Sequence, residues 1–197
     1  LADMLAHHFD EPFADASALP TWRVCQLARE TVTVALSGDG ADEALAGYRR
    51  YKFQAAEERV RGMLPAGLRG PVFGALGRYY PKADWAPQKF RAKSTFQSLA
   101  RDGAEAYARA VGVTPEEIRG QFYTGSFARS LQGHRAEDRY VETMRNAPAD
   151  EALDRAQYAD MTHWLPGAIL TEVGRTSMAV SLEAGGPLLG YRIVARA

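Results

Sequence analysis

The stretch TVTVALSGDGADEALAGYRRY, residues 31–51, is the most informative part of this sequence. β-Branched residues alternate up to Leu36, which predicts a short strand over Thr31 to Leu36. Gly38 and Gly40 follow; both can adopt positive φ and let a ligand approach the backbone. Helical periodicity then resumes, with Asp42 as the expected cap. A strand that ends in a glycine turn and opens a helix brings backbone amides close to a phosphate, so this stretch predicts a nucleotide-binding corner.

Three acidic residues in the same stretch do not suit a simple phosphate site. Asp39, Asp42 and Glu43 would repel a phosphate, although a helix cap would account for Asp42. Asp39 lies between the two glycines, where its carboxylate could hold Mg²⁺ or orient a substrate amine or ammonia. Ser37 can donate its hydroxyl to the same ligand. The alternative interpretation is a strand–turn–helix corner with solvated acids, because glycine-rich turns are common.

Composition limits the class of protein. The 197 residues include 24 basic and 24 acidic side chains, so no global positive field favours nucleic acid as a partner. The only cysteine, Cys25, excludes an internal disulfide and fits a reducing compartment. No apolar run approaches the roughly 20 residues of a membrane span. We therefore expect a cytoplasmic location, with neither nucleic acid nor membrane as partner.

Most of the remaining sequence has helical periodicity. The expected helices are one capped by Asp15 or Ser17, one from Asp42 to Met63, one over 90–110 interrupted at Asp102-Gly103, one capped by Thr114, one from Asp150 to Trp164 broken at Pro166-Gly167, and one over 168–175. Residues 63–87 predict a loop-rich connection with at most one short helix, and residues 181–192 predict a loop. Because a lone strand cannot form a sheet, we expect the partners of the one clear strand to lie outside this chain.

Two extended motifs carry a resemblance to a known family. LSGDGADEALAGYRRY (36–51) resembles the second nucleotide-site motif of glutamine-dependent asparagine synthetases, S-G-[DE]-G-x-D-E-x-x-x-G-Y, and FDEPFADASALPT (9–21) resembles the segment before it. WLPGAILTEVGRTSMAVSLEAGGPLLGYR (164–192) is similar to a second family motif. The middle, KFRAKSTFQSLARD (89–102), resembles a bacterial subgroup linked to exopolysaccharide and exosortase gene systems.

The resemblance implies an α/β nucleotide-binding synthetase domain of the Rossmann-like, PP-loop type. Residues 1–197 would be a mostly helical part of that domain. The family forms an aspartyl-adenylate from aspartate and MgATP, and ammonia released from glutamine in a separate domain then displaces AMP. The implied cofactors are ATP and Mg²⁺, the implied substrates are aspartate or a related carboxylate and ammonia, and the intact protein is expected to be a homodimer.

The family motif also implies roles for individual residues, and no dedicated metal site is expected. Asp39 would be catalytic, acting in adenylate formation or on the incoming amine. The residues implied to bind the nucleotide are Ser37, Gly38, Gly40, Asp42 and Glu43.

Departures from the family pattern bring activity into question. The first phosphate loop, the glutaminase cysteine and the adenylation lysine are expected outside this chain, and Cys25 cannot replace that cysteine. Five charged positions of the second motif differ: aspartate is replaced by Ala168, Gly174 and Gly190, lysine by Glu172, and arginine by Gly185. We therefore expect the chain alone to be inactive. The alternative is a non-catalytic remnant or a partner-binding helical module.

Three weaker signals favour ordinary structural roles. Asp160 and His163 have a spacing that could bind a metal on a helix, but a local hydrogen bond is the better interpretation without a further ligand. The arginine-rich runs YRRYKF (48–53) and RVRGMLPAGLRG (59–70) could form a nucleic-acid surface, but the neutral net charge favours a solvated helix face.

Overall fold

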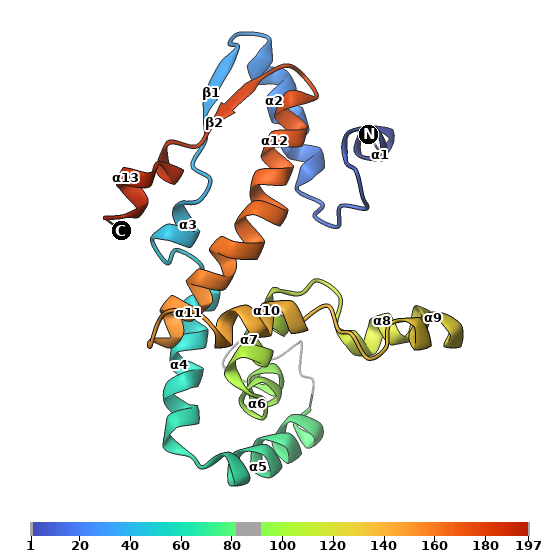
Figure 1. Ribbon diagram of the computed structural model, residues 1–197, viewed down its shortest axis with the longest axis vertical. Coiled ribbons are helices and arrows are strands. Elements are labelled where there is room, and N and C mark those ends of the chain that lie inside the picture. The colour runs from blue at the N-terminus through green and yellow to red at the C-terminus, as the bar shows by residue number, and fades with distance from the viewer. Residues whose placement is uncertain (1, 82–91, 197) are drawn as a thin grey trace. The chain divides into compact units, whose positions relative to one another are not determined.

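The computed structural model describes residues 2–81 and 92–196. The chain divides into two compact units (Figure 1). Unit 1 combines Leu1–Tyr48 with Ala159–Ala197, and unit 2 is Arg49–Tyr158. The first unit therefore brings together the two motifs that lie far apart in the sequence.

A two-stranded parallel sheet forms the centre of unit 1. Strand β1 (Val34–Leu36) pairs with strand β2 (Glu183–Gly185), and the N–H of Ser37 donates to the Gly185 carbonyl at 2.8 Å. The expectation that β1 has no partner within this chain is therefore wrong. Residues 183–185 read Glu-Ala-Gly and contain no β-branched or aromatic residue, so pairing with β1, and not propensity, makes this segment a strand.

Two helices of unit 1 pack against each other beside the sheet. They are α2 (Ala18–Arg29) and α12 (Thr171–Met178). The predicted start of α2 is confirmed, because Ser17 is its N-cap residue, although its side chain caps no backbone amide. Apart from η2 (Asp160–Leu170), the other helical elements of this unit are short: α1 (Ala2–His8), α3 (Ala41–Ala44), η3 (Pro187–Leu189) and α13 (Tyr191–Val194). Residues 181–192, predicted as a loop, thus contain β2, η3 and the start of α13.

The helix predicted from Asp42 to Met63 is interrupted. It consists of α3 and, in unit 2, α4 (Arg49–Met63). The N-cap residue of α3 is Gly40, so the prediction that Asp42 caps the helix is wrong. Ala46 adopts a φ of 54°, which ends α3, and the N–H of Gly47 returns to the Asp42 carbonyl at 2.9 Å. A left-handed residue cannot continue a right-handed helix.

The helix around Pro166 is continuous, so the predicted break at Pro166-Gly167 is wrong. Residues Asp160–Leu170 form a π-helix, η2, that runs directly into α12. In an α-helix the proline ring would clash with the carbonyl four residues earlier. A π-helix is wound more widely and moves that carbonyl away. The hydroxyl of Thr171 donates to the Pro166 carbonyl at 2.8 Å, so a side chain adds a hydrogen bond to the backbone bonds of this turn.

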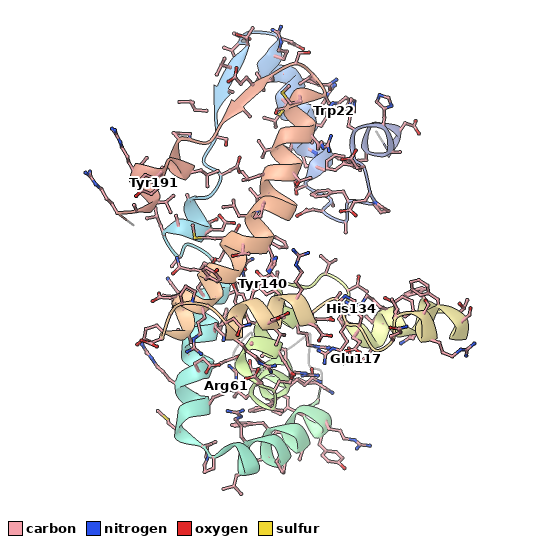
Figure 2. All side chains as sticks on the ribbon, in the orientation of Figure 1. Trp22, Arg61, Glu117, His134, Tyr140 and Tyr191 are labelled. Carbon is pink, nitrogen blue, oxygen red and sulfur yellow. The ribbon has the colours of Figure 1, made fainter. Side chains whose placement is uncertain are left out.

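Unit 2 consists of helices. After α4 they are α5 (Ala66–Tyr79), α6 (Lys93–Leu99), α7 (Gly103–Val111), α8 (Glu116–Phe122), α9 (Gly125–Ser130), α10 (Asp138–Arg145) and α11 (Ala152–Ala159). Its core combines aliphatic side chains with two buried tyrosines: the ring of Tyr51 stacks on that of Tyr107 at 6.3 Å, and Tyr107 also faces Tyr140, which Figure 2 labels. The described residues contain no helix long and apolar enough to cross a membrane.

Two predictions for unit 2 fail and one is confirmed. The interruption at Asp102-Gly103 is confirmed, since it separates α6 from α7. Phe90, where that helix was predicted to begin, lies outside the described residues. Residues 63–87 were expected to form at most one short helix, but α5 has 14 residues. Of its glycines, Gly77 allows close packing, because a Cβ there would lie 2.9 Å from the Gln97 Cγ of α6. The N-cap of α8 is Pro115, one residue after the expected Thr114.

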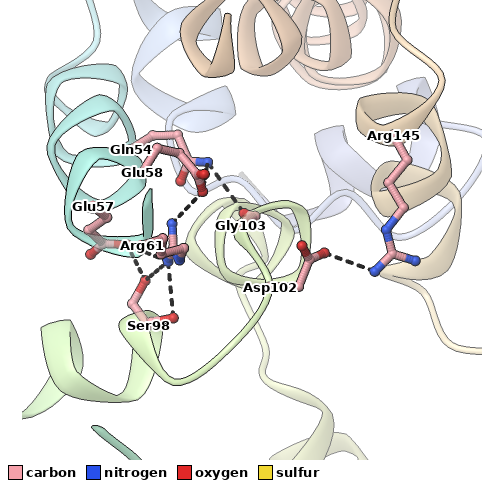
Figure 3. Close-up of polar contacts among 8 residues, drawn as sticks. All are labelled: Gln54, Glu57, Glu58, Arg61, Ser98, Asp102, Gly103 and Arg145. Carbon is pink, nitrogen blue, oxygen red and sulfur yellow. Dashed lines mark hydrogen bonds and ion pairs between the residues drawn. The ribbon is translucent and has the colours of Figure 1, made fainter. Parts of the chain in front are cut away.

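A buried cluster of charges joins α4 to α6 (Figure 3). The guanidinium of Arg61 donates to Glu57 at 2.9 Å and to Glu58 at 2.7 Å. It also donates to the Ser98 carbonyl at 3.0 Å. Arg61 is buried, and these bonds compensate for the removal of its charge from water, although its buried Nε–H has no hydrogen-bond partner among the described residues.

Candidate active site

A pocket of about 430 Å³ lies in unit 1 at the carboxyl end of β1. Its walls come from β1, β2, α2, η2 and α12, and they are mainly apolar. Ser37 and Asp39 both line it, and the Ser37 hydroxyl donates to the Asp39 carboxylate at 2.6 Å. Ligands of open parallel sheets bind beyond the carboxyl ends of the strands. The sheet therefore places these two predicted site residues where a ligand is expected.

The two glycines of the loop differ in their roles. Gly40 has a φ of 84°, and a Cβ there would lie 2.0 Å from the Leu189 Cδ2. Gly38 lies outside the positive-φ region, contrary to the expectation, and a Cβ there would meet nothing within 4 Å. Gly40 is therefore required by conformation and by packing on η3, whereas Gly38 leaves open space beside Ser37.

This contrast gives a matched pair of variants. Gly40→Ala is expected to lower the free energy of unfolding by about 1–3 kcal/mol, because alanine is strained at positive φ and its methyl group overlaps Leu189. Gly38→Ala is expected to change it by less than about 0.5 kcal/mol. Urea unfolding of both variants measures the difference, and equal losses would contradict the assignment.

Asp42 and Glu43, predicted to bind the nucleotide, make contacts within the loop. The carboxylate of Glu43 is buried and accepts from the Tyr48 hydroxyl at 2.8 Å. Asp42 lies against Gly47, where a Cβ would approach its Oδ1 to 2.0 Å. Helix α3 has four residues, and both acids lie in its first turn. A helix of this length has a small dipole, and the negative charges of Asp42 and Glu43 in its first turn would repel a phosphate.

Glu172 is a pocket residue that the sequence interpretation treated only as a lost positive charge. It is buried, and its carboxylate accepts from the Ser17 hydroxyl at 2.6 Å and the Thr21 hydroxyl at 2.7 Å. These bonds join α12 to α2 along one side of the pocket. Ser17 and Thr21 are four residues apart and so share a helix face, but only the tertiary fold brings that face to Glu172.

Glu172→Gln tests this contact. An amide is neutral and has one acceptor oxygen in place of two, so both hydroxyls lose a charged acceptor and one of them loses its acceptor altogether; we expect a loss of about 1–3 kcal/mol in the free energy of unfolding. Glu183→Gln, on an exposed position of β2, is the control with an expected change below about 0.5 kcal/mol. If the two variants unfold at the same urea concentration, Glu172 does not connect the helices.

Cys25 also lines the pocket but is not an activated nucleophile. Burial raises the pKa of its thiol, although a hydrogen bond with Thr176 acts in the opposite direction. Since the thiolate is the reactive form, a raised pKa keeps the group protonated and inert at neutral pH.

The charges in the pocket are negative. Within the described parts of the chain, its lining contains the carboxylates of Asp39 and Glu172 and no arginine or lysine. No group of three or more potential metal ligands occurs among the described residues, and Asp160 and His163 gain no third ligand there. Mg²⁺ is commonly held by one or two carboxylates together with substrate phosphates. Asp39 fits that use, but a triphosphate would need cations that this lining does not supply.

Comparison with known proteins places this geometry in a family. The asparagine synthase family model matches residues 1–197, which includes the loop, β2 and both helices that line the pocket. The chain belongs to the asparagine synthase family. The family predicted from the two motifs is thus confirmed, while the subgroup linked to exopolysaccharide systems stays a prediction. The mostly helical asparagine synthase domain, with its short parallel sheet, is consistent with the predicted Rossmann-like class.

Curated relatives match most of this asparagine synthase family chain. The glutamine-hydrolysing asparagine synthetase 1 of Bacillus subtilis is 29% identical over 182 residues, which are 92% of this chain and 27% of the relative. A putative glutamine-hydrolysing asparagine synthetase of Mycobacterium tuberculosis is 30% identical over 193 residues, or 95% of this chain and 27% of the relative. The chain thus spans about a quarter of the length of these two relatives. No solved structure matches it.

A shorter match is more similar. A putative asparagine synthetase 2 of Methanocaldococcus jannaschii is 52% identical over 48 residues, which are 24% of this chain and 9% of the relative. The higher identity is confined to a stretch of that length, while the longer alignments remain near 30%.

Proposed function

We propose that the protein is an ATP-dependent carbon–nitrogen ligase that converts aspartate, or a related carboxylate, into its amide. Activation as an acyl-adenylate precedes attack by ammonia. The observation that carries this proposal is the Ser37–Asp39 pair at the end of β1, which lines the pocket of a chain matched throughout by the asparagine synthase family.

Two residues of the pocket have defined tasks in this reaction. Bound MgATP supplies the activation of the carboxylate. The Asp39 carboxylate holds the metal or orients the incoming ammonia, where its charge stabilises positive charge that develops on the attacking nitrogen. The Ser37 hydroxyl fixes the orientation of Asp39 through the 2.6 Å hydrogen bond. Gly38 leaves space for a ligand beside this pair, and Gly40 sets the direction of the loop.

The remaining requirements are met elsewhere in the protein. The lining described here lacks cations, so the phosphates are neutralised by Mg²⁺ and by groups beyond this pocket. Ammonia comes from glutamine, which the names of the relatives support, and the protein acts as a cytoplasmic homodimer. Asp42 and Glu43 stabilise the conformation of the nucleotide loop through their contacts inside it.

A non-catalytic role is the second candidate, and a specific observation favours it. The pocket contains two carboxylates, one of which, Glu172, occupies the position of a family lysine and is held by α2. A domain that kept this fold without the cation could serve as a binding module. It would bind neither ATP nor a carboxylate substrate.

Product analysis separates the two candidates. The full-length protein is incubated with ATP, Mg²⁺, aspartate and glutamine or ammonium chloride, and nucleotides and amino acids are quantified. The ligase produces AMP, pyrophosphate and asparagine in equal amounts. ADP in place of AMP would contradict adenylate chemistry, and no turnover with unchanged ATP would favour the binding module.

A further inference from the structure

Unit 2 contains a cavity of its own, which the proposed ligase chemistry does not use. Its volume is about 350 Å³, and its walls come from α4, α6, α7 and the turn between α6 and α7. Phe53 and Ala106 contribute apolar surface to it, and the charged residues of the described lining are Glu57, Arg101 and Arg109. A cavity of this size that combines apolar walls with a few charged groups is typical of a site for a small organic molecule.

The charges of this lining are compensated unequally within it. The Glu57 carboxylate accepts from Arg61 at 2.9 Å, inside the buried cluster, so its charge is already neutralised. Arg101 and Arg109 remain partly open to solvent, with side chains 33% and 32% exposed. The guanidinium of Arg101 is held in place because it donates to the Gln97 carbonyl at 2.7 Å. The described lining therefore presents an excess of positive charge to a ligand.

A carboxylate that does not belong to the lining faces both arginines. Glu117 on α8, labelled in Figure 2, places one carboxylate oxygen 2.8 Å from Arg109 and the other 3.9 Å from Arg101. The hydrogen bond from Arg109 lowers the pKa of Glu117, so this carboxylate is charged at neutral pH. The two guanidiniums are thus already arranged around the two oxygens of one carboxylate, a group that arginine binds well.

Glu117 can leave this position without any movement of α8. Its side chain is 59% exposed, and an exposed ion pair of this kind contributes little free energy. Helix α8 is fixed independently, because Arg119 donates to both carboxylate oxygens of Glu137, at 2.7 and 2.6 Å. A carboxylate that approaches the two arginines from the cavity therefore meets only a weak competitor.

We propose that the cavity of unit 2 binds a small organic acid, whose carboxylate takes the place of Glu117 on Arg101 and Arg109. The apolar part of the acid lies against Phe53 and Ala106. A phosphate shares this mode of recognition, but the structure favours a carboxylate because that group already fits between the two guanidiniums. The site lies wholly within unit 2 and does not depend on the proposed ligase activity.

Ligand-observed NMR titration of the full-length protein, without ATP, tests the proposal. The probe is phenylacetate, and its neutral counterpart of similar shape is phenylacetamide. We expect phenylacetate to bind and phenylacetamide to bind at least about ten-fold more weakly, because the amide has no charge for the arginines. Phenyl phosphate is the probe for the alternative anion. Binding of phenyl phosphate but not of phenylacetate would overturn the choice of a carboxylate.

Glu117→Gln gives the sharpest result, because a competing carboxylate and a merely structural one have opposite effects when removed. Loss of the competitor is expected to tighten phenylacetate binding about two- to five-fold, the factor that corresponds to an exposed ion pair. Glu116→Gln is the matched control in the same helix. The Glu116 carboxylate lies 3.4 Å from Arg135 and outside the described cavity lining, so this variant should bind as the unchanged protein does.

Arg109→Gln removes one of the two proposed ligands and is expected to weaken phenylacetate binding about ten-fold or more. Arg129→Gln, at an exposed position of α9, is its control and should leave the affinity unchanged. Circular dichroism confirms that each variant is folded. The proposal would be overturned by an unchanged protein that does not bind phenylacetate, by Glu117→Gln without a gain in affinity, or by equal affinities of the Arg109 and Arg129 variants.

Discussion

Replacing Arg61 by alanine is expected to lower the free energy of unfolding by about 3–5 kcal/mol. The Arg61 side chain is 3% exposed and that of its partner Glu57 is 16% exposed. Alanine would leave the Glu57 carboxylate, which also accepts from the Ser98 hydroxyl, and the Glu58 carboxylate without their cation. Removing Arg61 is costly because the Glu57 carboxylate, which is only 16% exposed, keeps little water and loses its counter-charge, whereas the Glu58 carboxylate is 32% exposed and regains water more readily. Urea unfolding followed by circular dichroism measures the loss.

Arg145→Ala is the matched control for this prediction. Arg145 donates to Asp102 at 2.8 Å, but their side chains are 55% and 50% exposed (Figure 3). Water and salt screen such a pair, so its removal is expected to cost only about 0–1 kcal/mol. Losses of similar size in the two variants would mean that burial does not decide the strength of these ion pairs.

Asp39→Asn is expected to lower the rate of aspartate-dependent exchange between ATP and pyrophosphate by about 100-fold or more. The substitution keeps the size of the side chain and an acceptor for the Ser37 hydroxyl, but it removes the charge that faces the pocket. The affinity for ATP is expected to change by less than about three-fold, since the charge acts on the reacting centre. Exchange kinetics and equilibrium dialysis of ATP measure the two quantities separately.

The control for Asp39 is Glu30→Gln, which removes a carboxylate at the exposed end of α2 outside the pocket lining. We expect its exchange rate to equal that of the unchanged protein. Undiminished exchange in Asp39→Asn would exclude Asp39 from adenylate formation and leave it only the role of orienting ammonia. A parallel loss of ATP affinity would instead assign its role to binding.

Local signals predicted the parts of the fold that depend on neighbouring residues. The alternating run before Ser37 predicted β1, and the serine before Ala18 predicted the start of α2. Asp102-Gly103 predicted the break between α6 and α7. In each case the signal lies in the local sequence, although β1 is completed by pairing with the distant β2 and the Ser17 side chain bonds to Glu172 and caps no amide of α2.

Tertiary packing determined the parts that the sequence did not predict. Strand β2 has weak strand propensity and forms because β1 offers it a free edge. Pro166 ends an α-helix in most settings, but the π-helical winding accommodates it. The glycines of α5 have low helix propensity, yet Gly77 lets the helix approach α6 closely. These outcomes depend on residues far away in the chain.

The residues of the candidate site also separate into those that the sequence predicted and those that only tertiary packing brings together. The family motif predicted Ser37 and Asp39, and both line the pocket. The contribution of Glu172 could not be predicted, because Ser17 and Thr21 lie more than 150 residues from it and reach it only through the packing of α2 on α12. Glu172, predicted from the sequence only as a lost positive charge, therefore has hydrogen-bond partners of its own on α2.

We propose that the pocket at the end of β1 belongs to a carboxylate-activating site. Exchange of labelled pyrophosphate into ATP by the unchanged full-length protein tests it most directly, because exchange requires reversible formation of an acyl-adenylate and no ammonia. We expect exchange that appears on addition of aspartate or a related carboxylate and is absent without it. A folded protein that shows no exchange with any such carboxylate, or exchange that is independent of the carboxylate, would rule out carboxylate activation at this pocket.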